Sequence, residues 1–132
     1  VERYEVYNKL SLNDLLNSSD VISIHCPLNE RTHNLIDAEE LAMMKKSAIL
    51  INVARGGIVN EAALAEALNN KQIRGAALDV FSAEPLRESP LYNLQDPYRL
   101  LASPHNAWSS VEAIDRLVDC IAGNIQEYIA QK

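Results

Sequence analysis

Apolar residues along this chain alternate between short continuous runs and stretches in which they recur every three or four positions. The run from Ala48 to Ala54 is apolar on both faces, which is typical of a strand inside a parallel sheet. Short apolar runs predict strands at residues 5–7, 21–25, 48–54, 73–81 and 99–103.

The stretches between these runs predict helices, because apolar residues at helical spacing follow a capping residue. Ser11 with Asp14, and Asp37 with Glu40, have the spacing of an N-terminal capping pair. Asn60 is a third expected cap. The apolar residues of these three helices are Leu12, Leu15 and Leu16, then Leu41 and Met44, then Ala63, Leu64, Ala67 and Leu68.

A longer helix is predicted at the end of the chain, opened by Ser109 with Glu112 as its capping pair. Its apolar residues fall three or four apart, so they lie along one face. They are Val111, Ile114, Val118, Ile121, Ile125 and Tyr128.

Strands that alternate with helices predict an α/β fold with a parallel sheet, covered by helices on both faces and joined by right-handed crossovers. Gly56-Gly57 turns the chain after one strand, and residues 82–98, which include three prolines, form a long polar loop. We expect residues 1–132 to form one domain in which the last four predicted strands are contiguous and follow the chain order.

Composition and charge narrow the class of protein. Of the 132 residues, 48% are hydrophobic and 23% are charged, as in an ordinary globular domain. The formal net charge of −6 argues against a nucleic-acid partner, which needs clustered Lys and Arg. No apolar run approaches the roughly 20 residues of a membrane span, and no signal peptide is visible. We expect a cytoplasmic protein without a membrane partner, either processed or cut from a longer chain before Val1.

The cysteines and two of the histidines are not expected to carry chemistry. Cys26 and Cys120 lie far apart, without His partners at metal spacing, so we interpret them as reduced thiols and predict no metal site. Cys26 is expected to line a site rather than act as a nucleophile, because no activating base is identifiable. His25 and His33 are interpreted as structural or exposed.

Residues that can carry chemistry stand at the ends of the predicted strands. Arg55 follows one strand, Asp79 and Glu84 lie at and after the end of the next, and His105 follows the last. Ligands of open parallel sheets bind beyond the carboxyl ends of the strands, so we expect these side chains to converge around one pocket. A guanidinium, a carboxylate and an imidazole in one pocket can bind an anionic keto compound and move a proton.

Each of these residues also has an interpretation without function. Arg55 can be a surface arginine, and Glu84, which precedes a proline, can simply be solvated. Asp79 can hydrogen-bond a loop, and His105 can be a loop histidine whose hydrogen bonds are satisfied. Position at strand ends alone leaves these alternatives open.

Four strings of residues change this balance. They are HCPLNERTHNLI, MKKSAILINVARGGIVNEAALAEAL, GAALDVFSAEP and SPHNAW, and they occur in this order along the chain. Together they resemble the D-isomer-specific 2-hydroxyacid dehydrogenase family. The last string, through Trp108, is most similar to the glycerate dehydrogenase and hydroxypyruvate reductase branch of that family.

The resemblance implies a role for each candidate residue. By position, Arg55 matches the substrate-binding arginine of the family, Glu84 its acidic partner and His105 its acid–base histidine. Asp79 matches the aspartate that engages the nicotinamide carboxamide. The residues implied to contact the cofactor, which is NAD or NADP, are Cys26, Pro27, Val53, Ala54, Arg55, Asp79, His105 and Ala107.

These implied roles agree with the chemistry of the side chains. The guanidinium of Arg55 is permanently charged and can hold a substrate carboxylate by two parallel hydrogen bonds. Imidazole is the side-chain group suited to proton exchange near neutral pH, so His105 can give a proton to a ketone and take it back in the reverse reaction. A carboxylate such as Glu84 beside the imidazole favours the charged ring and fixes its tautomer.

The chain also departs from the family pattern. Family members are longer, carry a substrate domain, and have a G-x-G-x-x-G fingerprint that none of the four glycines here forms. We therefore expect a partial Rossmann-like, doubly wound parallel sheet that lacks the first strands and the substrate domain. The strand at 21–25 would then expose an unpaired edge. We expect this fragment to be inactive by itself and the full-length protein to be a homodimer.

Three functions remain open at this point. The first is an NAD(P)-dependent oxidoreductase that transfers a hydride to or from a small 2-keto or 2-hydroxy acid. The second is an NAD-sensing co-regulator or binding protein that uses the same fold as an interaction surface. The third is a folding module without activity of its own.

Overall fold

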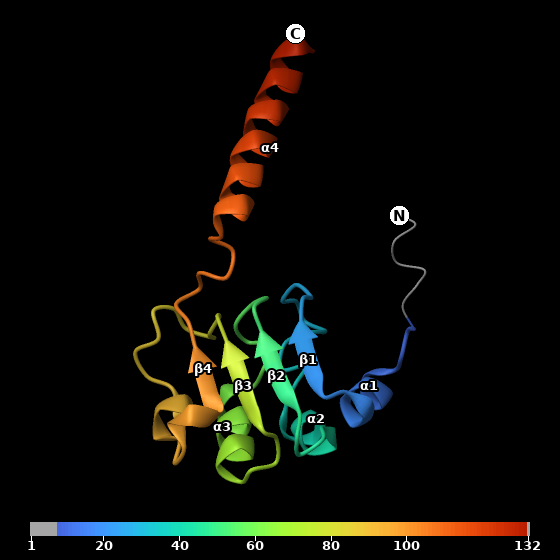
Figure 1. Ribbon diagram of the computed structural model, residues 1–132, viewed down its shortest axis with the longest axis vertical. Coiled ribbons are helices and arrows are strands. Elements are labelled where there is room, and N and C mark those ends of the chain that lie inside the picture. Colours follow the sequence, from blue (N-terminus) through green and yellow to red (C-terminus); the bar gives the residue numbers. More distant parts are fainter. Residues whose placement is uncertain (1–7, 132) are drawn as a thin grey trace.

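Four parallel strands form one sheet in the computed structural model, which describes residues 8–131. The strands are β1 (Val21–Ile24), β2 (Ile49–Asn52), β3 (Gly75–Leu78) and β4 (Leu100–Ala102). Their order in space is their order in the chain, and β1 forms one edge (Figure 1). The predicted α/β fold and parallel sheet are thereby confirmed. The strand predicted at residues 5–7 lies outside the described residues.

Each strand is shorter than the apolar run that predicted it. The run from Ile73 to Phe81, for example, contains the four residues of β3. Ile73 and Val80 lie outside β3 and are still buried, with exposed fractions of 0% and 2%. Apolar character at these positions reports burial in the core rather than strand pairing.

Three helices begin at the predicted caps. They are α1 (Leu12–Ser18), α2 (Ala38–Met43) and α3 (Glu61–Asn69). The side chains of Ser11, Asp37 and Asn60 accept backbone N–H groups of the first helical turn. Asp37 and Glu40 form a reciprocal capping box, as their spacing predicts.

The hydrophobic core lies between these helices and one face of the sheet. Leu50 of β2 lies in register with Ile22 of β1 and Ala76 of β3, and all three are buried. The helices cover them with fully buried leucines, which are Leu16 of α1, Leu41 of α2, and Leu64 and Leu68 of α3. This packing fixes the sheet on which the candidate site is built.

The opposite face of the sheet carries no helix of the described residues. Val21 and Leu101 on this face are 56% and 67% exposed. The sequence predicts helices on both faces, but α1, α2 and α3 contact one another in turn on the same face (Figure 1). Within residues 8–131 the sheet therefore has one covered face and one open face.

The segment 82–98 is less irregular than predicted. Two short 3-10 helices form here, η2 (Pro90–Asn93) within the segment and η3 (Pro97–Arg99) at its end, and each begins with a proline. Ser89 and Asp96 cap them by accepting backbone N–H groups. Proline suits the first position of a helical turn, because it has no N–H to leave unpaired.

The last helix, α4 (Val111–Ala130), begins one residue later than predicted. Ser110 is its N-cap, and its hydroxyl oxygen accepts the N–H of Ala113. The prediction of Ser109 as the cap was wrong, because the Ser109 hydroxyl instead donates to the carbonyl of Asn106 at 2.6 Å.

α4 extends away from the sheet, and none of its residues is buried (Figure 1). Its predicted apolar face is therefore exposed, from 39% at Ile114 to 71% at Val111.

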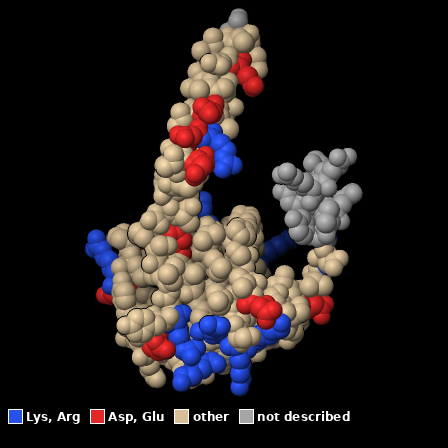
Figure 2. Space-filling view, in the orientation of Figure 1, with Lys and Arg blue, Asp and Glu red and all other residues tan. Residues whose placement is uncertain are grey.

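Figure 2 shows several Lys and Arg side chains gathered at the edge of the sheet where the strands begin, away from α4. None of the helices in residues 8–131 has the length and apolar character needed to cross a membrane.

Candidate active site

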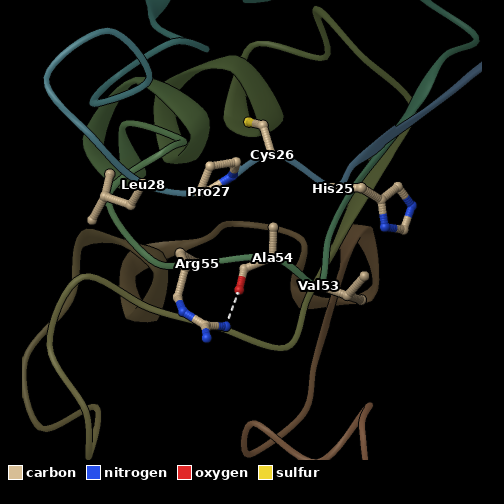
Figure 3. Close-up of a pocket in the computed structure, with 7 residues that line it drawn as sticks. All are labelled: His25, Cys26, Pro27, Leu28, Val53, Ala54 and Arg55. Carbon is tan, nitrogen blue, oxygen red and sulfur yellow. Dashed lines mark hydrogen bonds between the residues drawn. The ribbon is translucent and has the colours of Figure 1, made fainter.

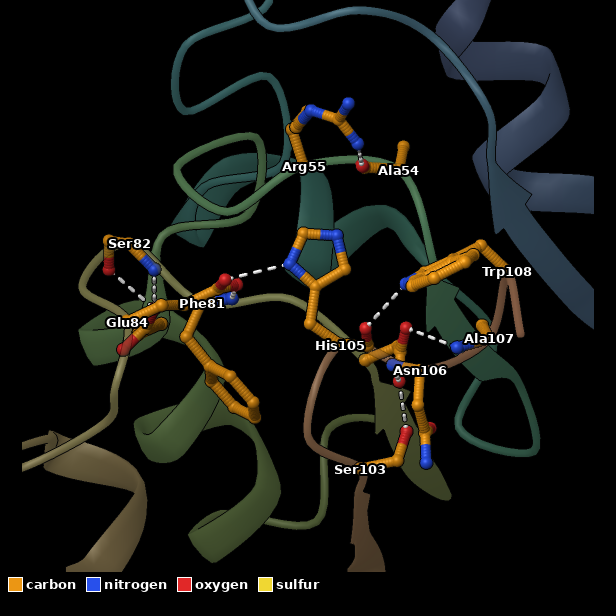
Figure 4. A network of polar contacts seen from close by, with 12 residues as sticks. Ala54, Arg55, Phe81, Ser82, Glu84, Ser103, His105, Asn106, Ala107 and Trp108 are labelled. Atoms are coloured by element: carbon orange, nitrogen blue, oxygen red, sulfur yellow. Dashed lines mark hydrogen bonds and ion pairs between the residues drawn. The ribbon is translucent and has the colours of Figure 1, made fainter. Parts of the chain in front are cut away.

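The carboxyl ends of β2, β3 and β4 lie at one edge of the sheet because the strands are parallel and in register. Asn52, Leu78 and Ala102 are partners in neighbouring strands. Arg55 and His105 each follow their strand by three residues. The two side chains therefore stand at the same edge, as Figure 4 shows.

Glu84 and His105 form a hydrogen-bonded pair that joins two loops (Figure 4). Oε2 of Glu84 lies 2.7 Å from Nδ1 of His105, and Oε1 accepts the N–H of Phe81 at 2.9 Å. The hydrogen bond from the Phe81 N–H has the largest effect in holding the pKa of Glu84 below its usual value, and the hydrogen bond with His105 adds to it. An ionised Glu84 can only accept a hydrogen bond, so Nδ1 carries the hydrogen that it donates to Oε2, and Nε2 is the ring nitrogen left to exchange a proton.

Asp79 is 2% exposed and binds three groups of the loop that carries His105. Its Oδ1 accepts the Ser103 hydroxyl at 2.6 Å and the Asn106 N–H at 3.0 Å, and its Oδ2 accepts the Ala107 N–H at 2.8 Å. Burial raises the pKa of Asp79, but these hydrogen bonds outweigh burial and hold that pKa below its usual value.

His105 has a left-handed backbone, with φ of +52°. Such a conformation is uncommon outside glycine and costs about 1–3 kcal/mol where the surroundings hold it. Asp79 binds the chain on both sides of His105, and the Trp108 indole N–H donates to the His105 carbonyl at 3.0 Å. These contacts fix the direction in which the imidazole points.

Arg55 is exposed and follows a turn that Asn52 holds from within the protein. Asn52 is 1% exposed, donates to the Arg55 carbonyl at 2.9 Å and accepts the Ala54 N–H at 3.0 Å. Nη1 of Arg55 donates to the Ala54 carbonyl at 2.7 Å (Figure 3). A guanidinium has five N–H donors, so this contact leaves most of them for a ligand.

The three predicted catalytic residues line two cavities rather than one. The first cavity, of about 650 Å³, is lined by residues 25–28 and 53–55 and includes Arg55 (Figure 3). The second, of about 480 Å³, is lined by Glu84 and His105 with apolar neighbours that include Phe81 and Tyr92. The structure thus pairs Glu84 with His105 and places Arg55 in a different cavity at the same sheet edge.

Two glycines let the Arg55 loop approach the Glu84 loop. A Cβ on Gly56 would overlap the backbone carbonyl of Phe81, so only glycine allows this approach. Gly57 has φ of +80°, which favours glycine. The Arg55-Gly56-Gly57 sequence therefore places the guanidinium and seats its loop against the segment that leads to Glu84.

The first cavity has the size of a site for a small molecule. About 300–1,000 Å³ is usual for small-molecule sites, and the cavity contains five of the residues implied to contact the cofactor. They are Cys26, Pro27, Val53, Ala54 and Arg55. Asp79, by contrast, is buried and lines neither of the two cavities; among the described residues its Oδ2 accepts one hydrogen bond. Ala107 contributes the N–H that orients this carboxylate.

His25 and His33 are exposed, as expected from the sequence. His25 also lines the first cavity, where its Nε2 lies 2.8 Å from the Ser23 hydroxyl. Within residues 8–131, no group of three His, Cys, Asp or Glu side chains is arranged to hold a metal ion.

Sequence reasoning missed three residues that support the site. Asn52 was detectable, because it is the single polar residue inside the apolar run 48–54. Ser103 binds Asp79, and Glu61 binds the loop that carries Glu84. Neither had a signal in the sequence, because both contacts join residues more than twenty positions apart.

Curated proteins similar to this chain are dehydrogenases of 2-hydroxy acids. The chain is 45% identical over 123 residues to glycerate dehydrogenase of Methylorubrum extorquens, covering 93% of this chain and 39% of that protein. It is 44% identical over 121 residues to D-3-phosphoglycerate dehydrogenase of Mycobacterium bovis, covering 92% of this chain and 22% of that protein. The chain thus spans less than half the length of these relatives.

Solved structures of related enzymes have the same fold. A D-isomer specific 2-hydroxyacid dehydrogenase from Lactobacillus delbrueckii ssp. bulgaricus, in its NAD-complexed form, matches with a TM-score of 0.80 and 31% identity. The match covers 92% of this chain and 40% of that one. An acyclic imino acid reductase in complex with NADPH and D-Arg matches with a TM-score of 0.82 and 34% identity, covering 93% and 38%.

A family model matches most of the chain. It is described as D-isomer specific 2-hydroxyacid dehydrogenase, NAD binding domain, and it matches residues 1–107. The matched region contains every strand of the sheet and all of the candidate site residues. The chain therefore belongs to the D-isomer specific 2-hydroxyacid dehydrogenase family, and residues 1–107 correspond to the NAD binding domain of that family.

Proposed function

We propose that this chain is the nicotinamide-binding part of a D-2-hydroxyacid dehydrogenase, which transfers a hydride between NAD(P)H and a small 2-keto or 2-hydroxy acid. The observation that carries the proposal is the 2.7 Å pair of Glu84 and His105 at the sheet edge that also bears Arg55. Membership of the family supports the same chemistry. Arg55, Glu84 and His105 are the proposed catalytic residues.

The roles of these residues follow from their charges and contacts. When bound, the nicotinamide supplies or accepts the hydride. Arg55 holds the substrate carboxylate and stabilises negative charge that develops on the carbonyl oxygen. Nε2 of His105 gives a proton to that oxygen during reduction and removes it during oxidation, while ionised Glu84 stabilises the imidazolium.

Within the family we propose glycerate and hydroxypyruvate as the substrate pair. The 45% identity to a glycerate dehydrogenase supports this choice, as does the string from Ser103 to Trp108. We propose NAD or NADP as the cofactor, because the family is defined by an NAD binding domain and a similar reductase structure holds NADPH. We propose that the cofactor is contacted by the eight residues that the family resemblance implies.

We further propose that residues 1–132 are a single partial nucleotide-binding domain of a longer two-domain enzyme, which acts in the cytoplasm as a homodimer. Coverage of 39% and 22% of two relatives supports the longer length. The open face of the sheet and the exposed apolar face of α4 offer surface for the rest of that protein. By itself the chain is proposed to be inactive, because it has no glycine fingerprint for the pyrophosphate.

The test is an assay of NADH oxidation by the full-length protein that contains this chain, with hydroxypyruvate and glyoxylate as substrates. We expect His105→Ala to lower kcat by about 10²–10⁴-fold, as loss of a general acid does. His33→Ala is the matched control, because His33 is exposed and lines neither of the two cavities. The 132-residue chain alone is expected to show no turnover.

Two outcomes would contradict the proposal. Turnover that is slow and indifferent to His105→Ala would favour an NAD-sensing co-regulator that uses the same fold. Rapid turnover by the 132-residue chain would show that neither the fingerprint nor a second domain is needed, and would overturn the proposal of a partial domain.

A further inference from the structure

The loop that carries Glu84 is tied at both ends to one carboxylate outside the candidate site. Oε1 of Glu61 accepts the N–H of Ser82 at 2.7 Å and also the Ser82 hydroxyl. Oε2 of Glu61 accepts the hydroxyl of Ser89 at 3.0 Å. We call these three hydrogen bonds the Glu61 bridge. Because Ser82 and Ser89 flank Glu84, the bridge closes the base of the segment 82–89.

The position of Glu61 is itself fixed. Glu61 is the first residue of α3, and the preceding Asn60 caps that helix by accepting the N–H groups of Ala62 and Ala63. Leu64 and Leu68 anchor α3 in the core with exposed fractions of 0% and 1%. The bridge therefore attaches a surface loop to one of the best-buried elements of the described residues.

The contacts of Glu84 begin directly beside the bridge. The Phe81 N–H donates to Oε1 of Glu84, and the N–H of the next residue, Ser82, donates to Glu61. Two consecutive backbone N–H groups thus point at two different carboxylates. If Ser82 moves, the peptide that holds Glu84 moves with it, and so does the contact between Glu84 and His105.

We propose that Glu61 is a positioning residue, which holds Glu84 where it meets His105 by fixing both ends of the segment 82–89. Its value for catalysis rests on the proposed function of the Glu84–His105 pair. The bridge itself can be tested without any assay of activity, so failure of one proposal is separable from failure of the other.

The test follows the titration of the Glu84 carboxyl by NMR in the 132-residue chain labelled with ¹³C at glutamate. Glu61→Ala is expected to raise the pKa of Glu84 towards its usual value, because the Phe81 N–H and His105 no longer hold the ionised form. Removing a neighbouring negative charge has the opposite effect and lowers a carboxyl pKa. An upward shift therefore identifies lost positioning rather than lost charge.

Hydrogen exchange gives a second measurement. The Phe81 amide is bonded to Glu84 and not to Glu61, so it reports the loop rather than the deleted contact. We expect its exchange to accelerate at least about tenfold in Glu61→Ala, the scale of a hydrogen bond to a charged group. Glu61→Gln keeps one carbonyl oxygen as an acceptor and is expected to fall between the parent and Glu61→Ala.

Glu66→Ala is the matched control, because Glu66 is exposed on the same helix. An unchanged or lowered pKa of Glu84 in Glu61→Ala would overturn the proposal, and so would an equal upward shift in Glu66→Ala. If Glu61→Ala does not fold, Ser82→Ala decides the question, because it removes one hydroxyl contact and keeps the Ser82 N–H. A smaller upward shift in that variant supports the bridge, and no shift overturns it.

Discussion

α3 and α4 are built alike but lie in different surroundings. Each begins after a polar N-cap and carries apolar residues at helical spacing. The nine residues of α3 include four that are buried, whereas the twenty residues of α4 include none. The comparison shows that capping and spacing determine where a helix begins, while burial depends on what lies beside it.

The same contrast divides the stability of the chain. Burial of apolar surface contributes about 25 cal/mol for each Å² removed from water. This contribution is available to α3, which packs against the sheet, and not to α4, whose apolar residues remain exposed. We therefore expect substitutions on the two helices to have very different effects on the free energy of unfolding.

Truncation of a leucine in α3 gives the largest expected effect. Leu64 is 0% exposed, so Leu64→Ala should lower the free energy of unfolding by about 2–5 kcal/mol, as is usual for buried leucines. Ile121 of α4 is 51% exposed, and Ile121→Ala should change it by less than about 0.5 kcal/mol. Urea unfolding of both variants measures the difference. Equal losses would mean that α4 packs against an apolar surface in solution.

Glycine replacement gives the next effect and should differ in sign between the two regions. Gly56→Ala places a Cβ on the Phe81 carbonyl, so we expect a loss of about 1–3 kcal/mol in the free energy of unfolding. Gly123 lies in α4, where a Cβ would meet no atom within 4 Å outside the backbone of its own helix, so Gly123→Ala should favour the helix by about 0.5–1 kcal/mol. Thermal unfolding and helical NMR shifts test the two expectations. A tolerated Gly56→Ala would show that the Arg55 loop can move away.

We call the described chain before α4 the body. The strands and helices of the body were predictable from the sequence, because their signals are local. Capping by Ser11, Asp37 and Asn60 depends on residues within one helical turn, and all three caps are confirmed. The open face of the sheet was not predictable. An apolar strand such as β2 has the same pattern whether its second face is covered by this chain or left open.

The candidate site was predictable in its location and less so in its connections. Parallel strands bring Arg55 and His105 to one edge, and the order of strands along the chain suffices for that inference. The contacts of Asp79 with Ser103 and of Glu61 with Ser89 join distant segments. Such contacts depend on the exact course of loops, for which periodicity carries no information.

Acid should lower the free energy of unfolding of the body through Asp79, which lies outside α4. The pKa of Asp79 is lowered by folding, so its contribution to stability is present above the unfolded-state pKa of about 3.9 and is lost as pH falls through the lower folded-state pKa. Asp79→Asn should lower the free energy of unfolding at neutral pH by about 1–3 kcal/mol, because an amide cannot accept all three hydrogen bonds. The free energy of unfolding of this variant should also change less with pH in the acid range than that of the parent.

Unfolding measured at several pH values below and above about 4 checks this expectation. Ser103→Ala is the milder companion variant, because it removes one of the three donors to Asp79 and keeps the carboxylate. We expect it to change the acid dependence in the same direction by a smaller amount. If the stability of Asp79→Asn depends on pH as that of the parent does, Asp79 is not the source of the acid dependence.

The smallest expected effect concerns two equivalent caps, Ser11 of α1 and Ser110 of α4. Loss of an N-cap side chain costs a helix about 0.5–2 kcal/mol. In Ser11→Ala this cost should appear in the unfolding of the whole body, because Leu16 of α1 is 0% exposed in the core. In Ser110→Ala it should appear as lower helical content in α4, measured by NMR shifts of residues 111–130, with unfolding of the body unchanged.

Ser109→Ala completes this comparison, because the Ser109 hydroxyl binds the Asn106 carbonyl rather than the start of α4. It should leave the helical content of α4 higher than Ser110→Ala does. If Ser110→Ala instead destabilises the body as much as Ser11→Ala, α4 and the body unfold as one cooperative unit. The contrast between α3 and α4 would then hold for burial but not for cooperativity, since exposed helices can still share an unfolding transition through the segment that joins them.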